Sequence, residues 1–390
     1  MPHIPFLKSR GDRPVTETDM ATETQPTIAI RTCTAADYES VFALYDDVFG
    51  KEAGRRFRAR WRWQFFDNPA CRDAPSEMWV AELDGAIVGF LASFPVRMQL
   101  AGRVQLVYHD CDLIVAPQAR RGGVGQRLVE AYDAFANPLS NALAYAPANG
   151  RIRERVGYRA VHAVPIALRP YNAAAIARYV GVTERLPRGL SPVTHGVTAI
   201  LGVGFAAANR LRAPRAPADR TVERLSGAGE EIDRLWARCA THFPFAAVRD
   251  AAWVQWRFLE DPLYDVTVLA ARDGSGAVTG YLAFRVTPRP DLRLGRILDL
   301  FALPDDVATV DALLHRALAL TRADHADLVS CVGLHPALRR RVHRYLYVKP
   351  ARLDRPAWLL WKGDPALRER VHDAGEWHIS HADSDIGFAP

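Results

Sequence analysis

The stretch that decides the fold reads Leu113-Ile-Val-Ala-Pro-Gln-Ala-Arg120-Arg121-Gly122-Gly123-Val124-Gly125-Gln-Arg-Leu128. Its apolar start predicts a strand that ends at Pro117, and residues 124–136 have the spacing of a helix. Glycines let a backbone approach a ligand closely, and the first amides of a helix attract anions. The stretch therefore predicts a cradle for a diphosphate, to which Arg120 and Arg121 add charge-assisted hydrogen bonds.

The glycine spacing excludes two other phosphate-binding loops. No Gly-Lys-Ser/Thr follows, as a Walker loop requires, and the pattern differs from the Gly-x-Gly-x-x-Gly of dinucleotide-binding folds. The remaining alternative is a tight strand-to-helix turn that needs no ligand. That alternative leaves the two adjacent arginines unexplained, so we favour the diphosphate cradle.

Working outward, the sequence predicts a mixed α/β (α+β) fold with strands that pair mainly with their neighbours. An Asp84-Gly85 turn joins two alternating strands, and a turn at Ala101-Gly102 leads into the strand before the cradle. Predicted strands cover residues 28–31, 78–83, 86–94, 104–115, 142–146 and 158–168, and predicted helices cover 34–48, 124–136 and 151–156.

Three motifs recur in the same order in the second half of the chain. The segment 63–69 (WQFFDNP) recurs at 256–262 (WRFLEDP), 84–92 (DGAIVGFLA) at 273–283, and 112–117 (DLIVAP) at 299–304. Three matches in register predict two copies of one fold. The second copy lacks the cradle, because Pro304 is followed by Asp305 and Asp306, whose carboxylates would repel phosphate.

These observations divide the chain into five parts. We expect a polar, disordered tail over residues 1–26, a first domain over 27–170, a helical and linker segment over 171–220, a degenerate second domain over 221–363, and a C-terminal segment over 364–390. The last part combines aromatic residues with carboxylates, which suggests that it packs at the cleft between the domains and holds a cationic or sugar ligand.

Composition narrows the class of protein. The chain has 390 residues, of which 49% are hydrophobic and 24% charged, so it is long enough for more than one core. Its 50 basic and 44 acidic residues leave a net charge of +6, which suits an anionic small molecule, and no nucleic acid is expected. Five cysteines without a Cys-x-x-Cys pair and no signal peptide predict a cytoplasmic protein without a metal. The apolar run 197–208 is too short to span a membrane but leaves peripheral contact with a membrane open. The sequence does not specify the oligomeric state.

The cradle resembles the acyl-CoA loop of the GCN5-related N-acetyltransferase (GNAT) superfamily, whose pattern Arg/Gln-x-x-Gly-x-Gly/Ala is met by Arg120, Gly123 and Gly125. The resemblance covers roughly residues 28–168. It implies two tandem GNAT-like domains, each a mostly antiparallel, twisted and splayed sheet flanked by helices. It also implies that acetyl-CoA is the acyl-CoA co-substrate and that the strand, the loop and the later helix hold it. The residues implied at these positions are Leu113, Ile114, Val115, Arg120, Arg121, Gly122, Gly123, Val124, Gly125 and Asn149.

The same resemblance directs attention to the strand before the loop for a general base. His109 and Asp110 are the leading candidates, and strand alternation predicts that His109, Cys111 and Leu113 share one face unless a bulge breaks the parity. Asp112 is better explained as structural, since its counterpart Asp299 persists in the copy without the loop. Many family members carry a tyrosine acid where this chain has Arg153, so Tyr145 or Tyr158 would have to replace it.

Together these features predict an N-acyltransferase in which an amine attacks acetyl-CoA directly. The acceptor is expected to be a small molecule or a glycan precursor, with an amino sugar slightly favoured. Two alternatives stay open: an aminoacyl-type transferase acting on cell-envelope precursors, and a non-catalytic CoA-binding or scaffold protein that keeps the GNAT fold.

Overall fold

A computed structural model describes residues 28–143, 147–179, 191–349 and 355–383. The helices are α1 (Tyr38–Phe49), α2 (Lys51–Phe65), α3 (Val124–Phe135), α4 (Pro147–Arg155), α5 (Ala173–Tyr179), α6 (Ser191–Leu211), α7 (Glu230–Cys239), α8 (Ala251–Val254), α9 (Val307–Ala323), α10 (Pro336–Tyr345) and α11 (Arg368–Val371). The strands are β1 (Ala29–Thr32), β2 (Glu77–Leu83), β3 (Ala86–Leu100), β4 (Arg103–Val115), β5 (Leu139–Leu143), β6 (Arg159–Val164), β7 (Ile166–Pro170), β8 (Thr221–Arg224), β9 (Phe245–Ala247), β10 (Thr267–Arg272), β11 (Val278–Pro288), β12 (Arg293–Ala302), β13 (Leu328–Val332), β14 (Arg355–Trp361) and β15 (Trp377–His378).

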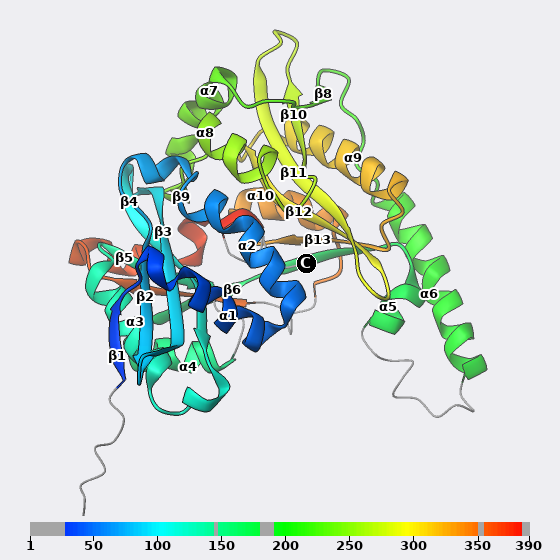
Figure 1. Cartoon of the computed structure of the whole chain (residues 1–390). Helices are drawn as coiled ribbons and strands as arrows, with labels where there is room; N and C mark the ends of the chain where they lie inside the picture. Colours follow the sequence, from blue (N-terminus) through cyan, green and yellow to red (C-terminus); the bar gives the residue numbers. More distant parts are fainter. Residues whose placement is uncertain (1–27, 144–146, 180–190, 350–354, 384–390) are drawn as a thin grey trace, which may run out of the picture.

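Two mixed sheets form the body of the molecule (Figure 1). The first has the order β1-β2-β3-β4-β5-β14-β6, with β9 added beside β3 and β15 beside β9, and the second has the order β7-β13-β12-β11-β10-β8. Neighbours pair antiparallel except at β4–β5, β12–β13 and β9–β15. The predicted mixed fold with two mostly antiparallel sheets is therefore confirmed.

The two halves exchange strands near their ends. β14 follows the second half in sequence but lies between β5 and β6 of the first sheet, and β7 pairs with β13 of the second sheet. The exchange ties the halves together through backbone hydrogen bonds. The predicted domain limits of 27–170 and 221–363 remain predictions, since the sheets do not follow them at these two strands.

Helices cover both faces of the first sheet because its central strands are apolar on both faces. Phe90 contacts Phe57 and Trp61 of α2 on one face, with ring centroids 6.3 and 6.0 Å apart. Gly89, the preceding residue, faces α3, where an added Cβ would lie 2.9 Å from Val124. Successive residues of β3 thus position α2 on one face of the sheet and α3 on the other.

The repeated tryptophans meet at the contact between the halves. Trp63 Nε1 donates to the Trp256 carbonyl and Trp256 Nε1 donates to the Trp63 carbonyl, both at 2.9 Å. Their rings stack with centroids 4.8 Å apart. This reciprocal contact follows from the repeat and relates the two halves by a local pseudo-twofold.

The C-terminal segment packs where the sequence analysis expected it, between the halves. β15 pairs with β9, and Asp383 binds Arg249 at 2.6 Å. Among the described residues, no helix has the length and apolarity needed to cross a membrane.

Candidate functional site

The predicted cradle forms an exposed turn between β4 and α3. Arg120, Arg121, Gly122 and Gly123 are exposed, whereas Val124 and Gly125 are buried beneath them. Gly123 is the N-cap of α3 with φ 75°, and an added Cβ would meet nothing within 4 Å. Because glycine offers no capping side chain, the first amides of α3 remain open to an outside acceptor.

The two arginines of the turn differ in what they do. The Arg120 Nε donates to the Val115 carbonyl at 3.2 Å, so this side chain folds back on the end of β4. Arg121 has φ 72°, in the left-handed region, and its exposed side chain lies beside the open helix terminus. Arg121 is therefore the arginine better placed to meet an anion at the turn.

β4 leaves its neighbour β5 before it reaches the turn. In the part of the chain that the structure describes, the two strands pair only at Tyr108–Ser140 and His109–Asn141. Among the described residues, the stretch of β4 that holds Leu113, Ile114 and Val115 pairs with β3 and with no strand on the β5 side. The backbone groups on that edge can bind an extended ligand in the way that they would bind another strand.

A bulge at Asp112 changes the strand parity, as the sequence analysis allowed. Asp112 has φ 56°, and the register of β3 with β4 shifts between Phe90 and Ala92. Cys111 and Asp112 therefore both meet α2: Gln64 Nε2 donates to the Cys111 Sγ at 3.2 Å, and Arg60 binds Asp112 with two hydrogen bonds of 3.0 and 2.6 Å. Simple alternation is wrong beyond this point, and Leu113 instead packs with Val129 and Tyr158.

His109 and Asp110 point to opposite faces of β4. Asp110 is buried and forms an ion pair with Arg153 of α4, which is itself fully buried. Burial raises the pKa of the Asp110 carboxyl to about 6, against the opposing charge of Arg153. His109, also buried, faces the second half of the molecule beside Phe94, at 5.4 Å between ring centroids.

Two further predicted residues contact Arg153 of α4. Asn149 accepts a hydrogen bond from Arg153 Nε at 3.2 Å. Tyr158 accepts from Arg153 and donates to Asp133 at 2.6 Å, and burial raises its pKa well above the ordinary tyrosine value. Tyr158 is thus held in a buried network and is poorly suited to give up its proton. Tyr145 lies outside the described residues.

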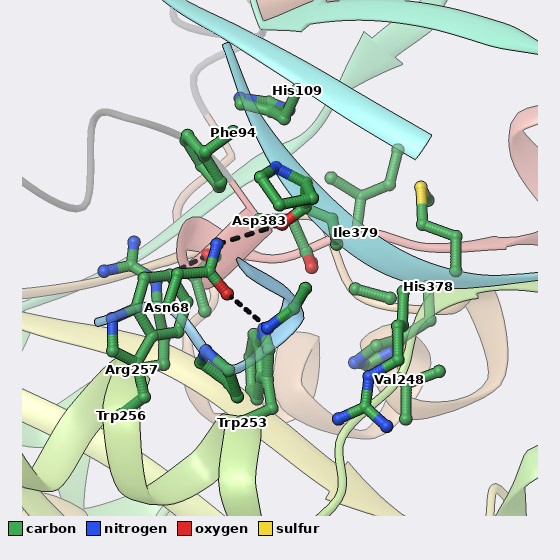
Figure 2. Close-up of a pocket in the computed structure, with 18 of the residues that line it drawn as sticks. Asn68, Phe94, His109, Val248, Trp253, Trp256, Arg257, His378, Ile379 and Asp383 are labelled. Atoms are coloured by element: carbon green, nitrogen blue, oxygen red, sulfur yellow. Dashed lines mark hydrogen bonds between the residues drawn. The ribbon is translucent and has the colours of Figure 1, made fainter. Parts of the chain in front are cut away.

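A cavity of about 70 Å³ opens between the two halves next to His109 (Figure 2). Its walls are aromatic and apolar, with Phe94, Trp253, Trp256 and Trp377 among them, and its polar groups include Asn68, Arg257, His378 and Asp383. Asp383 accepts from Arg249 and Ser380 through Oδ2, while its buried Oδ1 has no hydrogen-bond partner among the described residues. That oxygen is available to a donor group of a ligand.

The arginine-rich helix α2 does not form an anion-binding patch. Arg55 and Arg56 pair with Glu52, Arg58 pairs with Asp46, and Arg62 pairs with Asp67. Arg60 instead is buried against Asp112. Among the described residues, no group of three or more His, Cys, Asp or Glu side chains could hold a metal ion.

Sequence reasoning did not identify the residues of the second half that line the cavity. Trp256 and Arg257 belong to the repeated motif, from which only two copies of one fold were predicted. The recurrence of Trp63 at Trp256 was the available signal, because residues related by a pseudo-twofold often meet at the axis.

With this geometry established, comparison with known proteins identifies the first half. Residues 29–161 match the family model of the acetyltransferase (GNAT) domain. The predicted resemblance to the GNAT superfamily is thereby confirmed for this segment. No match is found among curated proteins.

Solved structures extend the similarity to both halves. A GCN5-related N-acetyltransferase from Kribbella flavida shares 16% identity at a TM-score of 0.55, over 86% of this chain and 71% of that one. N-myristoyltransferase from Saccharomyces cerevisiae with bound myristoyl-CoA shares 15% identity at 0.54, over 91% and 84%. A tandem GNAT protein from the clavulanic acid biosynthesis pathway shares 16% identity at 0.50, over 87% and 99%. At these identities the similarity establishes a tandem GNAT-like fold.

Proposed function

We propose that this chain is an acyl-CoA-dependent N-acyltransferase that uses acetyl-CoA and transfers the acetyl group to an amine. One observation carries the proposal: the open edge of β4 runs from the glycine-rich turn to His109, and His109 also lines the cavity between the halves. A donor bound along the edge and an acceptor bound in the cavity would meet at that residue.

The donor side rests on the turn and on the open edge. The diphosphate of CoA would bind the first amides of α3 and the guanidinium of Arg121, and the pantetheine arm would follow Leu113–Val115. These groups match the ligand, because the turn offers positive charge and unpaired amides while the edge offers backbone hydrogen bonds. Myristoyl-CoA bound in the yeast N-myristoyltransferase structure supports a CoA-type co-substrate for this fold.

For the proton transfer we assign His109 as the general base and Asp110 as a positioning residue. His109 faces the cavity, whereas Asp110 is paired with Arg153 on the other face of β4. The acceptor nitrogen would lose a proton to His109 as it attacks the thioester carbonyl. The C–N bond then forms, the C–S bond breaks, and the CoA thiolate takes up the proton that His109 accepted from the amine.

The cavity supports an acceptor that combines an amine with a flat or sugar-like body. Aromatic walls suit the apolar face of a sugar ring, and the unpartnered Oδ1 of Asp383 can accept from an ammonium or hydroxyl group. An amino sugar or a related glycan precursor has both features. This part of the proposal rests on the lining residues alone.

The donor site is tested by calorimetric titration with acetyl-CoA. We expect Gly123→Asp combined with Arg121→Ala to weaken binding by at least about tenfold, because a carboxylate replaces an anion-binding position and a charged hydrogen bond is lost. Gly102→Asp is the matched control, since Gly102 also has a positive φ with nothing within 4 Å of an added Cβ. Unchanged binding in the turn variant, or an equal loss in the control, would contradict the assignment.

A thiol-release assay with a panel of amines and amino sugars tests the chemistry. His109→Ala should lower kcat by about 10²- to 10⁴-fold while leaving acetyl-CoA affinity unchanged. A specific observation favours one competing function, a non-catalytic CoA-binding protein: Arg153 stands where the family often has its acid, and Tyr158 is held by Asp133. Binding of acetyl-CoA without thiol release for any acceptor would support that function.

A further inference from the structure

Helix α6 exposes a concentrated apolar surface that the proposed function does not use. It lies at the edge of the molecule beside α5 (Figure 1). Among the described residues, five of the ten exposed large hydrophobic side chains are on this helix: Val197, Ile200, Leu201, Val203 and Leu211. Ile200, Val203 and Leu211 are 74%, 72% and 87% exposed, which is far from the burial that such side chains normally reach.

These side chains occupy one face of the helix. At 3.6 residues per turn, the five positions fall within an arc of about 160° with Leu211 near its centre. The opposite face holds α6 to the protein through Asn209: its Nδ2 donates to the Pro170 carbonyl, and Tyr347 donates to its Oδ1. The apolar face therefore points away from the body of the molecule.

Basic residues border the apolar face. By the same spacing, Arg210 lies at one edge of the apolar face and is exposed. Arg212, the first residue after α6, is also exposed, and its guanidinium lies over the Tyr347 ring at 5.2 Å. Arg178 of α5 and Arg215, which follows α6, are also exposed. The segments α5, α6 and 212–218 contain no Asp or Glu. An apolar arc flanked by arginines is the pattern of a helix that lies in the interface of an anionic bilayer.

We propose that α6 docks this protein on an anionic lipid surface, with the helix axis parallel to the membrane and the Val197–Leu211 face in the headgroup and acyl boundary. The charges favour lipid over a second copy of the chain. In a symmetric dimer through this face, Arg210 and Arg212 of two copies would be brought together without a carboxylate from α5 or α6 to neutralise them. The inference is independent of the acyl-transfer proposal.

The test is co-sedimentation of the full chain with vesicles. Vesicles of equal parts phosphatidylcholine and phosphatidylglycerol should bind the protein, vesicles of phosphatidylcholine alone should bind it much less, and added salt should weaken binding. Ile200→Glu combined with Val203→Glu should reduce the partition coefficient by at least about tenfold, since two apolar side chains no longer enter the bilayer. Arg210→Ala and Arg212→Ala should each reduce it about fivefold.

Val307→Glu is the matched control, because Val307 is 46% exposed at the start of α9, outside the α6 surface. It should bind vesicles like the unchanged protein. Circular dichroism should show that every variant is folded, as expected for exposed positions. Absence of binding to the anionic vesicles, or equal binding by the α6 and Val307 variants, would overturn the proposal. So would a dimer in light scattering that the Ile200/Val203 variant dissociates without any vesicle binding, since a second copy would then cover the face.

Discussion

The two turns that follow β4 and β12 occupy the same place in the repeat and end differently. After β4, the N-terminus of α3 is capped by Gly123, which offers its amides to an outside acceptor. After β12, Asp306 caps α9 by accepting from Thr309 N at 3.0 Å, and Arg220 pairs with the same carboxylate at 3.4 Å. One terminus is left open for a ligand and the other is closed by its own side chain.

Strands β3 and β11 pack in the same way against the helix that follows each turn, although the two turns differ. Gly89 lies against Val124 and Gly280 lies against Thr309, where added Cβ atoms would approach to 2.9 and 2.7 Å. Asp112 and Asp299 both bind a buried arginine. The core contacts of the repeat thus persist in the half that lacks the glycine-rich turn, because packing and the turn use different residues.

The largest difference between the halves should be the cost of removing the buried arginine. Arg249 holds both Asp299 and Asp383, all of them largely or fully buried, so Arg249→Met should lower the free energy of unfolding by about 3–5 kcal/mol. Arg60 pairs with Asp112, and Arg60→Met should lower the free energy of unfolding by about 2 kcal/mol. Urea denaturation measures both, and a larger loss for Arg60 would reverse the ranking.

Acid should lower the stability of the folded protein through His381 of the C-terminal segment. Burial lowers the pKa of His381 to about 3, so the folded state holds this imidazole neutral while the unfolded state protonates near pH 6.5. Its contribution is complete above that pH and is lost as the pH falls toward 3, by about 2 kcal/mol between pH 7 and pH 5. His381→Asn should make the unfolding midpoint depend less on pH over this range, and an unchanged pH dependence would contradict the assignment.

The tryptophan pair tests whether its symmetry extends to function. Trp63→Phe and Trp256→Phe each remove one of the two reciprocal hydrogen bonds and should each cost about 1 kcal/mol of stability. Only Trp256 lines the cavity, so only its substitution should raise the KM for the acceptor. An equal change of KM in both variants would show that the effect passes through the contact between the halves.

The smallest expected effect concerns the closed turn. Asp306→Ala removes the cap of α9 and should lower the free energy of unfolding by about 1 kcal/mol. Acetyl-CoA affinity should stay unchanged, because the second turn is not assigned to the donor. A change in affinity measured by calorimetry would show that the two turns are coupled.

Local sequence patterns were enough to predict the elements around the donor turn. A strand ending at Pro117, glycines before an apolar helix and two adjacent arginines each act within a few residues, so their consequences do not depend on distant contacts. The bulge at Asp112 was foreseen only as an option, since its register depends on how β3 packs. The ion pair of Asp110 with Arg153 spans 43 residues and was not anticipated.

Residue types at short or repeated spacing were enough to predict the glycine-rich turn after β4, the twofold repeat and the absence of that turn from the second copy. Only the tertiary structure decided that β7 and β14 change sheets, that His109 rather than Asp110 faces the cavity, and that Asp383 reaches it from the C-terminal segment. These outcomes depend on which surfaces meet when the halves pack, and burial of apolar area and pairing of buried charges over long separations select them.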